Sequence, residues 1–271
     1  MSTGAGPAGL RVALVDPGDF TPPHNEALAR GLAEVGCTVR LWGMAGRPPT
    51  DPRIDKICHF YRFANGRLAR KLPESLVSLV KGLEHGPQLA SMAGVFEREG
   101  IDVPHIQWSP LPLLDRLFVE PLARRVPVVF TVHDSRPYNG SRGGPLVWGL
   151  ERFLGSVDAL IVHTEEARGR MIAAGHPPER VHHVPHGLID LGSEAPPRPI
   201  TRDRPIQLVM VGAMKPYKGI DLLLAALARL PAPQRARLRV TIAGRVFMDL
   251  TPFRELIARE GLGAIVELRP G

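Results

Sequence analysis

A loop with two lysines, between an apolar run and a helical pattern, is the first candidate site in this sequence. The apolar run at 208–211 ends at Gly212, and Lys215 and Lys218 follow it. Gly219 then precedes a helical pattern of leucines. A helix N-terminus offers unpaired N–H groups, and lysine ammonium groups suit phosphate oxygens. The pattern predicts an anion site, although two solvated lysines before an ordinary helix would have the same spacing.

His133 and Asp134 form a second candidate site, because they follow directly on the apolar run at 128–132. Side chains at the carboxyl end of a buried parallel strand face the ligand cleft in α/β folds. A histidine there can hydrogen-bond a reacting group as charge develops on it, and an aspartate can orient the imidazole ring. The alternative is a His-Asp turn that satisfies only its own backbone.

The elements that must position these residues alternate along the chain. Apolar runs predict short strands, and amphipathic patterns predict helices between them. The strands are expected at 10–15, 38–42, 57–63, 103–108, 128–132, 159–162, 181–184, 206–211, 238–243 and 265–268. The helices are expected at 25–35, 88–99, 113–125, 165–174, 220–230 and 252–260. This order predicts an α/β protein with doubly wound parallel sheets.

Two Rossmann-like domains are expected, one on each side of a linker. Residues 191–205 are rich in proline and charge and lack an apolar period, so we expect the linker there. The first domain would span 1–190 and the second 206–271. The alternation in the second domain stops before its sheet is complete. We therefore expect the sequence to be a truncated copy or a fragment of a longer protein.

The composition is that of a globular protein with a basic surface. Apolar residues make up 44% and charged residues 23% of the chain, and no apolar run is long enough to span a membrane. The net charge of +7 fits nucleic acid, an anionic membrane or phosphorylated ligands. Without zinc-finger spacing or an RNA-binding aromatic motif, nucleic acid is the weakest of the three. Cys37 and Cys58 allow no disulfide framework, and we expect a cytoplasmic protein.

Two further segments have weaker functional signals. At 61–81, arginines and lysines alternate with apolar residues, which suits either a peripheral contact with anionic lipid or the packed, solvated helix of a basic protein. His182, His183 and His186 are close in sequence, but Pro185 and the strand pattern prevent them from sharing a helix face as zinc ligands do. We expect these histidines to be structural and no metal to be bound.

Four segments resemble the retaining GT-B glycosyltransferases of family 4: TVHD at 131–134, VDALIVHTEEARGRM at 157–171, VHHVPHGLID at 181–190 and VMVGAMKPYKGIDLLLAAL at 209–227. The resemblance implies a hexosyltransferase-type enzyme that moves a sugar from a nucleotide diphosphate sugar to an acceptor hydroxyl, with retention and without a metal cofactor. It implies a role in polysaccharide or glycolipid biosynthesis, with a carbohydrate or lipid-linked acceptor.

The resemblance also assigns roles to the candidate residues. It implies that the donor diphosphate is bound by Gly212, Lys215, Lys218 and Gly219. His133 and Asp134 would act at the reaction centre. Gly18, at the place of the family's first glycine-rich loop, and Arg245, which follows Gly244, are further candidates for nucleotide or loop contacts, and a lone solvated arginine is the alternative for Arg245. Cations at these places would stabilise the departing diphosphate in the way that preorganised charge stabilises other transition states.

Two other functions stay open beside this one. Ala213 stands where the family often has its first cation, and the loop at 16–24 has one glycine where the family often has a pair. The paired glutamates with which the family holds the donor sugar would lie beyond Gly271. The alternatives are a sugar-nucleotide epimerase on the same architecture, and a non-catalytic remnant or subunit that binds an acceptor or a membrane.

Overall fold

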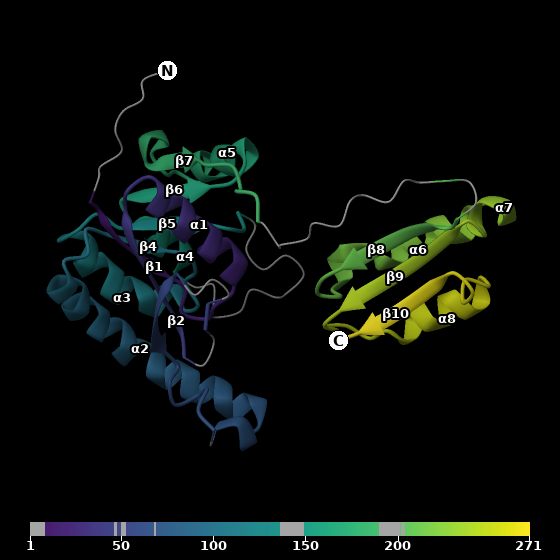
Figure 1. Ribbon diagram of the computed structural model, residues 1–271, viewed down its shortest axis with the longest axis horizontal. Coiled ribbons are helices and arrows are strands. Elements are labelled where there is room, and N and C mark those ends of the chain that lie inside the picture. The colour runs from purple at the N-terminus through teal and green to yellow at the C-terminus, as the bar shows by residue number, and fades with distance from the viewer. Residues whose placement is uncertain are drawn as a thin grey trace. The chain divides into compact units, whose positions relative to one another are not determined.

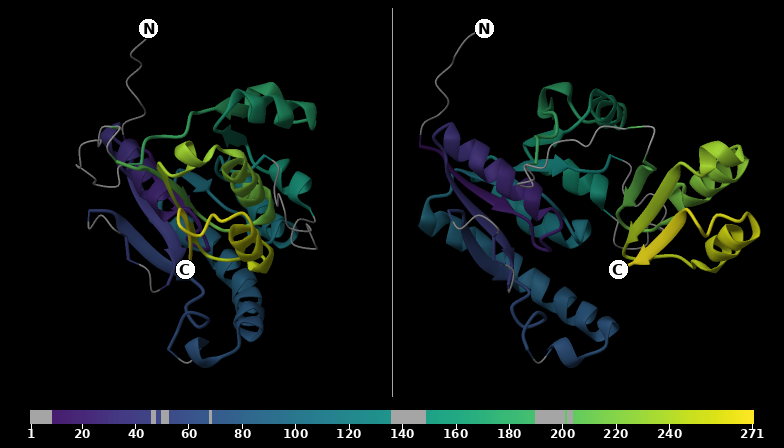
Figure 2. Two further views of the ribbon diagram at one scale, coloured as in Figure 1. Left: turned by 90° about the vertical axis from the view of Figure 1, so that its right-hand side faces the viewer. Right: turned by 45° about the vertical axis from the view of Figure 1, so that its right-hand side comes forward.

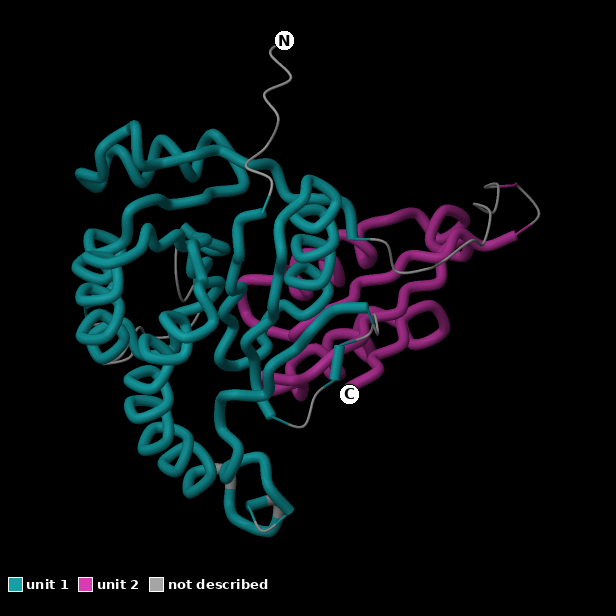
Figure 3. Tube along the Cα trace, turned by 60° about the vertical axis from the view of Figure 1, so that its left-hand side comes forward, with its two compact units in different colours: residues 1–137, 143–192 teal, residues 138–142, 193–271 magenta. Residues whose placement is uncertain are grey.

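The computed structural model contains two compact units, each built around a parallel sheet (Figure 1, Figure 3). It describes residues 9–45, 48–49, 53–67, 69–135, 149–189, 201 and 204–271. The described residues up to 189 form the first unit, and those from 201 onward form the second. The expected linker at 191–205 lies almost wholly outside the described residues. The expected α/β class with parallel, Rossmann-like sheets is confirmed.

Seven strands form the sheet in the described part of the first unit, in the order β3-β2-β1-β4-β5-β6-β7, and neighbouring strands are parallel. They are β1 (Arg11–Val15), β2 (Thr38–Met44), β3 (Asp55–Phe60), β4 (Val103–Ile106), β5 (Val129–Val132), β6 (Ala159–Val162) and β7 (Val181–His183). The chain adds β2 and β3 on one side of β1 and then β4 to β7 on the other. Such a switch point is where open α/β sheets bind ligands, at the carboxyl ends of the strands.

Helices cover both faces of this sheet, and the side chains of β1 show how. Val12 and Leu14 pack with Ala29 of α1 on one face. Ala13 and Val15 belong to the larger core on the other face, which contains buried residues of α2, α3 and α4. Because both faces are buried, the strand is a continuous apolar run. The helices of this unit are α1 (Pro22–Glu34), α2 (Glu74–Glu99), α3 (Pro112–Ala123), α4 (Leu150–Leu154) and α5 (Glu165–Ala173).

Helix α2 is the main departure from the expected elements. The sequence predicts a helix at 88–99 and leaves a separate one open at 61–81, whereas α2 begins at Glu74 and continues through Pro87. A proline inside a helix costs about 3 kcal/mol, because it removes a hydrogen bond and crowds the preceding turn. Residues on both sides of this proline pack against the larger core, namely Val77, Val80, Met92 and Phe96. This packing offsets the cost, and local sequence propensity does not reveal it.

The second unit is a sheet of three parallel strands in the order β10-β9-β8 with helices on one face (Figure 2). Its elements are β8 (Ile206–Val211), α6 (Ile220–Arg229), α7 (Ala232–Arg235), β9 (Leu238–Gly244), α8 (Thr251–Arg259) and β10 (Val266–Pro270). Leu224 and Leu227 of α6 pack on Ile242 of β9 in a core of their own. On the edge strand β8, Val209 and Val211 are 64% and 77% exposed, so the other face of this sheet is not covered by the described residues.

We expect Gly244→Ala to destabilise the second unit. Gly244 has a φ of +145°, and a Cβ built on it would overlap the carbonyl oxygen of Gly212 and lie 2.7 Å from the carbonyl carbon. The clash between two strand ends and the unfavourable backbone angle should lower the free energy of unfolding by about 2 kcal/mol or more. Urea denaturation measures this change.

Gly263→Ala is the matched control, because a Cβ there would meet nothing within 4 Å. Its free energy of unfolding should stay within about 0.5 kcal/mol of the wild-type value. Equal midpoints for the two variants would show that the strand ends do not approach each other as described.

Candidate functional site

Polar side chains follow four neighbouring strands of the first sheet at its carboxyl edge. The residues directly after β1, β4, β5 and β6 are Asp16, Gln107, His133 and His163, respectively. Because parallel strands end at the same edge, residues that are far apart in the sequence become neighbours here. This edge coincides with the switch point between β1 and β4.

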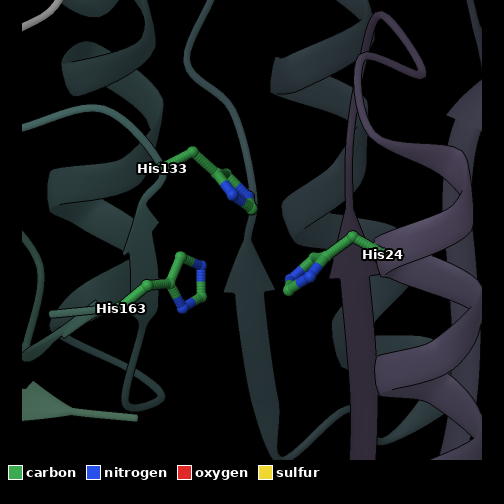
Figure 4. Close-up of side chains that lie close together, drawn as sticks. All are labelled: His24, His133 and His163. Carbon is green, nitrogen blue, oxygen red and sulfur yellow. The ribbon is translucent and has the colours of Figure 1, made fainter. Parts of the chain in front are cut away.

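Four histidines meet at this edge, and we call His24, His133, His163 and His186 the histidine cluster. The His24 ring lies 4.9 Å from that of His133, 5.4 Å from that of His163 and 4.7 Å from that of His186, between ring centroids. His163 also lies 5.3 Å from His133 and 5.0 Å from His186. Figure 4 shows His24, His133 and His163 reaching toward a common centre from three separate segments.

A hydrogen-bond network around Asp16 fixes the start of α1 and so the place of His24. One carboxylate oxygen, Asp16 Oδ2, accepts bonds from the Thr21 backbone N–H at 3.1 Å and from Asn25 Nδ2 at 2.7 Å. The indole of Trp108 donates a bond of 3.1 Å to Thr21 Oγ1. Burial raises the pKa of Asp16, whose second oxygen has no partner in the part of the chain that is described. The network therefore ties the loop after β1 to the loop after β4.

The Trp108 indole stacks on the His133 ring, with 5.1 Å between centroids and 10° between planes. On the ring edge, His133 Nε2 lies 3.1 Å from Gln107 Oε1. With the amide in this orientation Nε2–H is the donor, and His133 Nδ1 keeps its lone pair. Stacking and this hydrogen bond hold the imidazole in one orientation at the end of β5.

A buried chain of hydrogen bonds holds the loop that carries Trp108. Ser109 Oγ donates to Asp115 Oδ2 at 2.5 Å, and the other oxygen of Asp115 lies 2.6 Å from His85 Nε2. The remaining ring nitrogen of His85 lies 2.9 Å from the Tyr61 hydroxyl. Asp115 belongs to α3 and His85 to α2, so both helices contribute to the position of the indole.

The buried imidazoles are neutral at pH 7. Burial, with a smaller effect of neighbouring histidines, lowers the pKa of His133 to about 3 and that of His24 to about 4. The same causes lower the pKa of His105 in β4 to about 3, and its Nε2 lies 2.8 Å from Thr131 Oγ1. A neutral imidazole offers one N–H donor and one lone pair. These neutral rings can therefore hydrogen-bond a hydroxyl group or coordinate a metal ion, and they carry no positive charge of their own.

Asp134 and Gly18 lie beside this site, next to His133 and in the loop after β1. Asp134 is exposed at the end of β5, next to His133. A Cβ built on Gly18 would lie within 2.9 Å of Phe20 ring atoms, so the space beside this glycine is filled by an aromatic ring. Phe20 in turn packs against Trp108, with 5.3 Å between centroids. Gly18 thus allows Phe20 to pack in the loop after β1.

The second unit brings the predicted cations together at the carboxyl ends of β8 and β9. The Lys215 ammonium and the Arg245 guanidinium lie 5.3 Å and 5.2 Å from the centre of the Phe247 ring. Lys218 closes a short 3₁₀ turn (Pro216–Lys218) and lies 5.3 Å from the Tyr217 ring. Within the part of the chain that is described, no carboxylate pairs with these three cations.

The glycines of this loop leave room beside the cations. A Cβ on Gly212 would meet nothing within 4 Å, so the space beside the end of β8 is open. Gly219 has a φ of +72°, and its carbonyl accepts the first backbone bond of α6 from Leu223 at 3.0 Å. The open backbone, the cations and the N-terminus of α6 together suit an anionic ligand.

The roles that the sequence predicts for His133 and the cations stay predictions, and the sequence pattern does not predict the cluster of rings around His133. The structural role expected for His182, His183 and His186 also stays a prediction, and the His186 ring packs against the rings of His24 and His163. His183 instead lies 2.7 Å from Glu165, and His182 is exposed. His163 directly follows an apolar run as His133 does, which was a usable signal. No pattern in the sequence pointed to His24.

Residues 23–190 match Glycosyltransferase Family 4, which is more than half of the chain. The chain belongs to this family. The match spans the described elements from α1 to β7, including every residue of the histidine cluster. No curated protein sequence matches the chain.

Solved structures of the same fold include both transferases and epimerases. HepE of Anabaena, solved with UDP and glucose, is 15% identical with a TM-score of 0.62, over 96% of this chain and 68% of HepE. A glycosyltransferase of Rickettsia africae is 14% identical with a TM-score of 0.61, over 97% of this chain and 68% of its own. A UDP-N-acetylglucosamine 2-epimerase is 10% identical with a TM-score of 0.56, over 97% and 69%. These similarities show the GT-B fold of the family member described here.

Acid should destabilise the family member through His105. The pKa of His105 is about 3 in the folded protein and 6.5 in the unfolded chain. Its contribution to folding stability is therefore complete above pH 6.5 and is lost as the pH falls toward 3. Each pH unit in that window should cost about 1.4 kcal/mol of unfolding free energy for this one group. Urea denaturation between pH 8 and about 4.5 measures the slope.

His105→Gln provides the comparison, because glutamine can still bond Thr131 but does not titrate. The variant should lose stability less steeply below pH 6.5, while its difference from wild type should not change with pH above 7. Identical acid slopes would contradict the assigned pKa.

Proposed function

We propose that this family member moves a hexose from a nucleotide diphosphate sugar to a hydroxyl group of a carbohydrate or lipid-linked acceptor, with retention. Polysaccharide or glycolipid assembly is the process that such a reaction serves. The observation that carries the proposal is the group of Lys215, Lys218 and Arg245, which have no carboxylate partners among the described residues. Membership of Glycosyltransferase Family 4 supports it, as does the fold shared with HepE, which was solved with UDP and glucose.

The second unit would bind the donor. Breaking the bond between sugar and diphosphate leaves negative charge on the departing phosphate oxygens. Lys215, Lys218 and the N-terminus of α6 can stabilise this charge, with Gly212 and Gly219 allowing close approach of the backbone. Fixed cations of this kind would replace a metal ion, so we propose that transfer needs no metal cofactor. Arg245 would reach the nucleotide.

The first unit would supply the acceptor side of the reaction. His133 is held by Trp108 and Gln107 with one lone pair left over, so it can accept a hydrogen bond from a sugar hydroxyl. Because its ring is neutral at pH 7, it would orient the sugar and would not act as a cation. Asp134, exposed beside it, would bind the acceptor hydroxyl.

A sugar-nucleotide epimerase is the second candidate, because a UDP-N-acetylglucosamine 2-epimerase shares the fold at a TM-score of 0.56. An epimerase converts its donor without an acceptor, whereas a transferase needs one. Incubation with UDP-N-acetylglucosamine alone, followed by NMR, separates the two. A new sugar-nucleotide epimer would support the epimerase, and an acceptor-dependent product with the anomeric configuration of the donor would support the retaining transferase.

We expect Lys218→Ala and Lys215→Ala to weaken the binding of UDP-glucose. A hydrogen bond between a charged donor and phosphate contributes about 1.5–3 kcal/mol. The dissociation constant should therefore rise by about tenfold or more for each variant. Isothermal titration calorimetry with the 271-residue chain measures it.

Arg229→Ala is the control for these variants, since Arg229 is an exposed cation in the last turn of α6, the helix that follows the lysine loop. Its affinity for UDP-glucose should equal that of the wild type. Donor binding that is unchanged in Lys218→Ala would rule out the assigned diphosphate site. Absence of donor binding in the wild type would favour the non-catalytic alternative.

We also propose a peripheral contact with anionic membranes through the N-terminal part of α2. None of the described helices combines the length and apolar character needed to cross a membrane. On α2, however, Leu76, Leu79 and Leu83 are 41%, 59% and 69% exposed, at spacings that place them along one side of the helix. Val80, between them, packs against the core. Exposed leucines beside the basic segment at 61–81 suit the interface of an anionic bilayer.

Replacing Leu79 and Leu83 together by serine should reduce this membrane binding. Co-sedimentation with phosphatidylcholine vesicles that contain phosphatidylglycerol should fall by about tenfold, because two apolar side chains no longer enter the interface. Leu117→Ser is the control, because Leu117 is 63% exposed on α3. Equal loss in the control, or equal binding by all three proteins, would contradict the proposed surface.

A further inference from the structure

The histidine cluster has the geometry of a metal-binding site. Ring nitrogens of His24, His133 and His163, one from each residue, all lie within 4.8 Å of one another. Two nitrogens bound to one zinc ion at about 2.0–2.1 Å in tetrahedral geometry are about 3.4 Å apart. A bound ion would therefore draw these nitrogens closer together by up to about 1.4 Å. Figure 4 shows that the rings approach from α1, from the end of β5 and from the end of β6.

We propose that His24, His133 and His163 bind a transition-metal ion such as Zn²⁺ or Co²⁺, with His186 within reach as a fourth ligand. Three imidazoles and one exchangeable position form a common zinc coordination sphere. A set of nitrogen donors favours these ions over Mg²⁺ and Ca²⁺, which prefer oxygen ligands. The His186 ring lies 4.7 Å from the His24 ring and 5.0 Å from the His163 ring, between centroids.

Hydrogen bonds on the outer side of the rings prepare them for a metal ion. His163 Nδ1 donates to the Val184 carbonyl at 3.0 Å, so its Nε2 carries the lone pair. That Nε2 is buried and has no hydrogen-bond partner among the described residues. His186 Nδ1 likewise donates to the Gly187 carbonyl at 2.9 Å. Metal-bound histidines commonly donate their other N–H to a carbonyl or carboxylate in this way, which fixes the tautomer.

The two remaining rings also have a nitrogen available. The bond between His133 Nε2 and Gln107 Oε1 leaves His133 Nδ1 with its lone pair. None of the described residues hydrogen-bonds the His24 ring, although this residue is only 9% exposed. Burying a polar atom without a partner is unfavourable, and this applies to His163 Nε2. Coordination of one ion would satisfy the nitrogens of His24 and His163 at the same time.

The metal site would compete with the proposed transfer reaction. The lone pair of His133 can coordinate an ion or accept a bond from a sugar hydroxyl, but it cannot do both. A bound ion would therefore inhibit transfer, and would not assist it. The existence of the site does not rest on the proposed function, because metal binding is measured without donor or acceptor.

Titration of the untagged protein with Co²⁺ after dialysis against EDTA tests the proposal. We expect a visible absorption band from the bound ion that saturates at one Co²⁺ per chain and disappears when Zn²⁺ is added. Loss of a partner that only orients a ligand costs roughly 10–100-fold in metal affinity. Loss of a ligand itself, in His163→Asn or His24→Asn, should therefore weaken Zn²⁺ binding by about 100-fold or more.

His182→Asn is the matched control, because His182 is exposed on β7 and outside the cluster. This variant should bind Zn²⁺ as the wild type does. In the wild type, Zn²⁺ should shift the NMR signals of the cluster imidazoles, a measurement that needs no variant to fold. The proposal is wrong if the wild type gives no saturable Co²⁺ band, or if His182→Asn loses as much affinity as His163→Asn.

Discussion

Parallel pairing of β1 with β2 on one side and with β4 on the other is the constraint on which the first unit depends. Val15 pairs with both Trp42 and Ile106, so β1 and β4 end at the same level, while β2 continues beside them to Met44. The Asp16 N–H then donates to the Trp42 carbonyl at 2.9 Å, and the Gln107 N–H donates to the Val15 carbonyl at 2.8 Å. These bonds start the functional loops side by side. The hydrogen bonds between those loops, and the stacking of indole on imidazole, follow from this common starting level.

The carboxyl edge of the first sheet contains buried polar atoms that make no hydrogen bond to the described residues. Five buried side-chain nitrogen or oxygen atoms of the described residues have no hydrogen-bond partner, and three of them belong to this edge: Asp16 Oδ1, Gln107 Nε2 and His163 Nε2. Each costs about 1–3 kcal/mol as long as it stays unsatisfied. The larger core of the first unit, formed on the face of α2, α3 and α4, offsets that cost. The groups therefore remain available for a ligand.

The two units offer different electrostatic surroundings. In the first, burial keeps the rings of His24 and His133 neutral, so directional hydrogen bonds or metal coordination determine what binds. In the second, the Lys215 ammonium and the Arg245 guanidinium lie against the Phe247 ring, and none of these three residues is buried. Neutral imidazoles suit a hydroxyl group, and exposed cations suit phosphate oxygens. This division matches the two substrates of a sugar transfer reaction.

The sequence by itself determined the alternation of strands and helices and the positions of the single-segment candidates. The strands expected at 159–162 and 206–211 are confirmed as β6 and β8. A short apolar run is a local signal, so a strand can be predicted from it without knowing which distant residues it contacts. Tertiary packing decided what local pattern could not show. Packing against the larger core keeps α2 helical on both sides of Pro87. The fold also places the rings of His24 and His186 in contact, although these residues are 162 positions apart in the sequence. A spacing rule compares neighbours along the chain, whereas the sheet brings its functional residues together by aligning the ends of its strands.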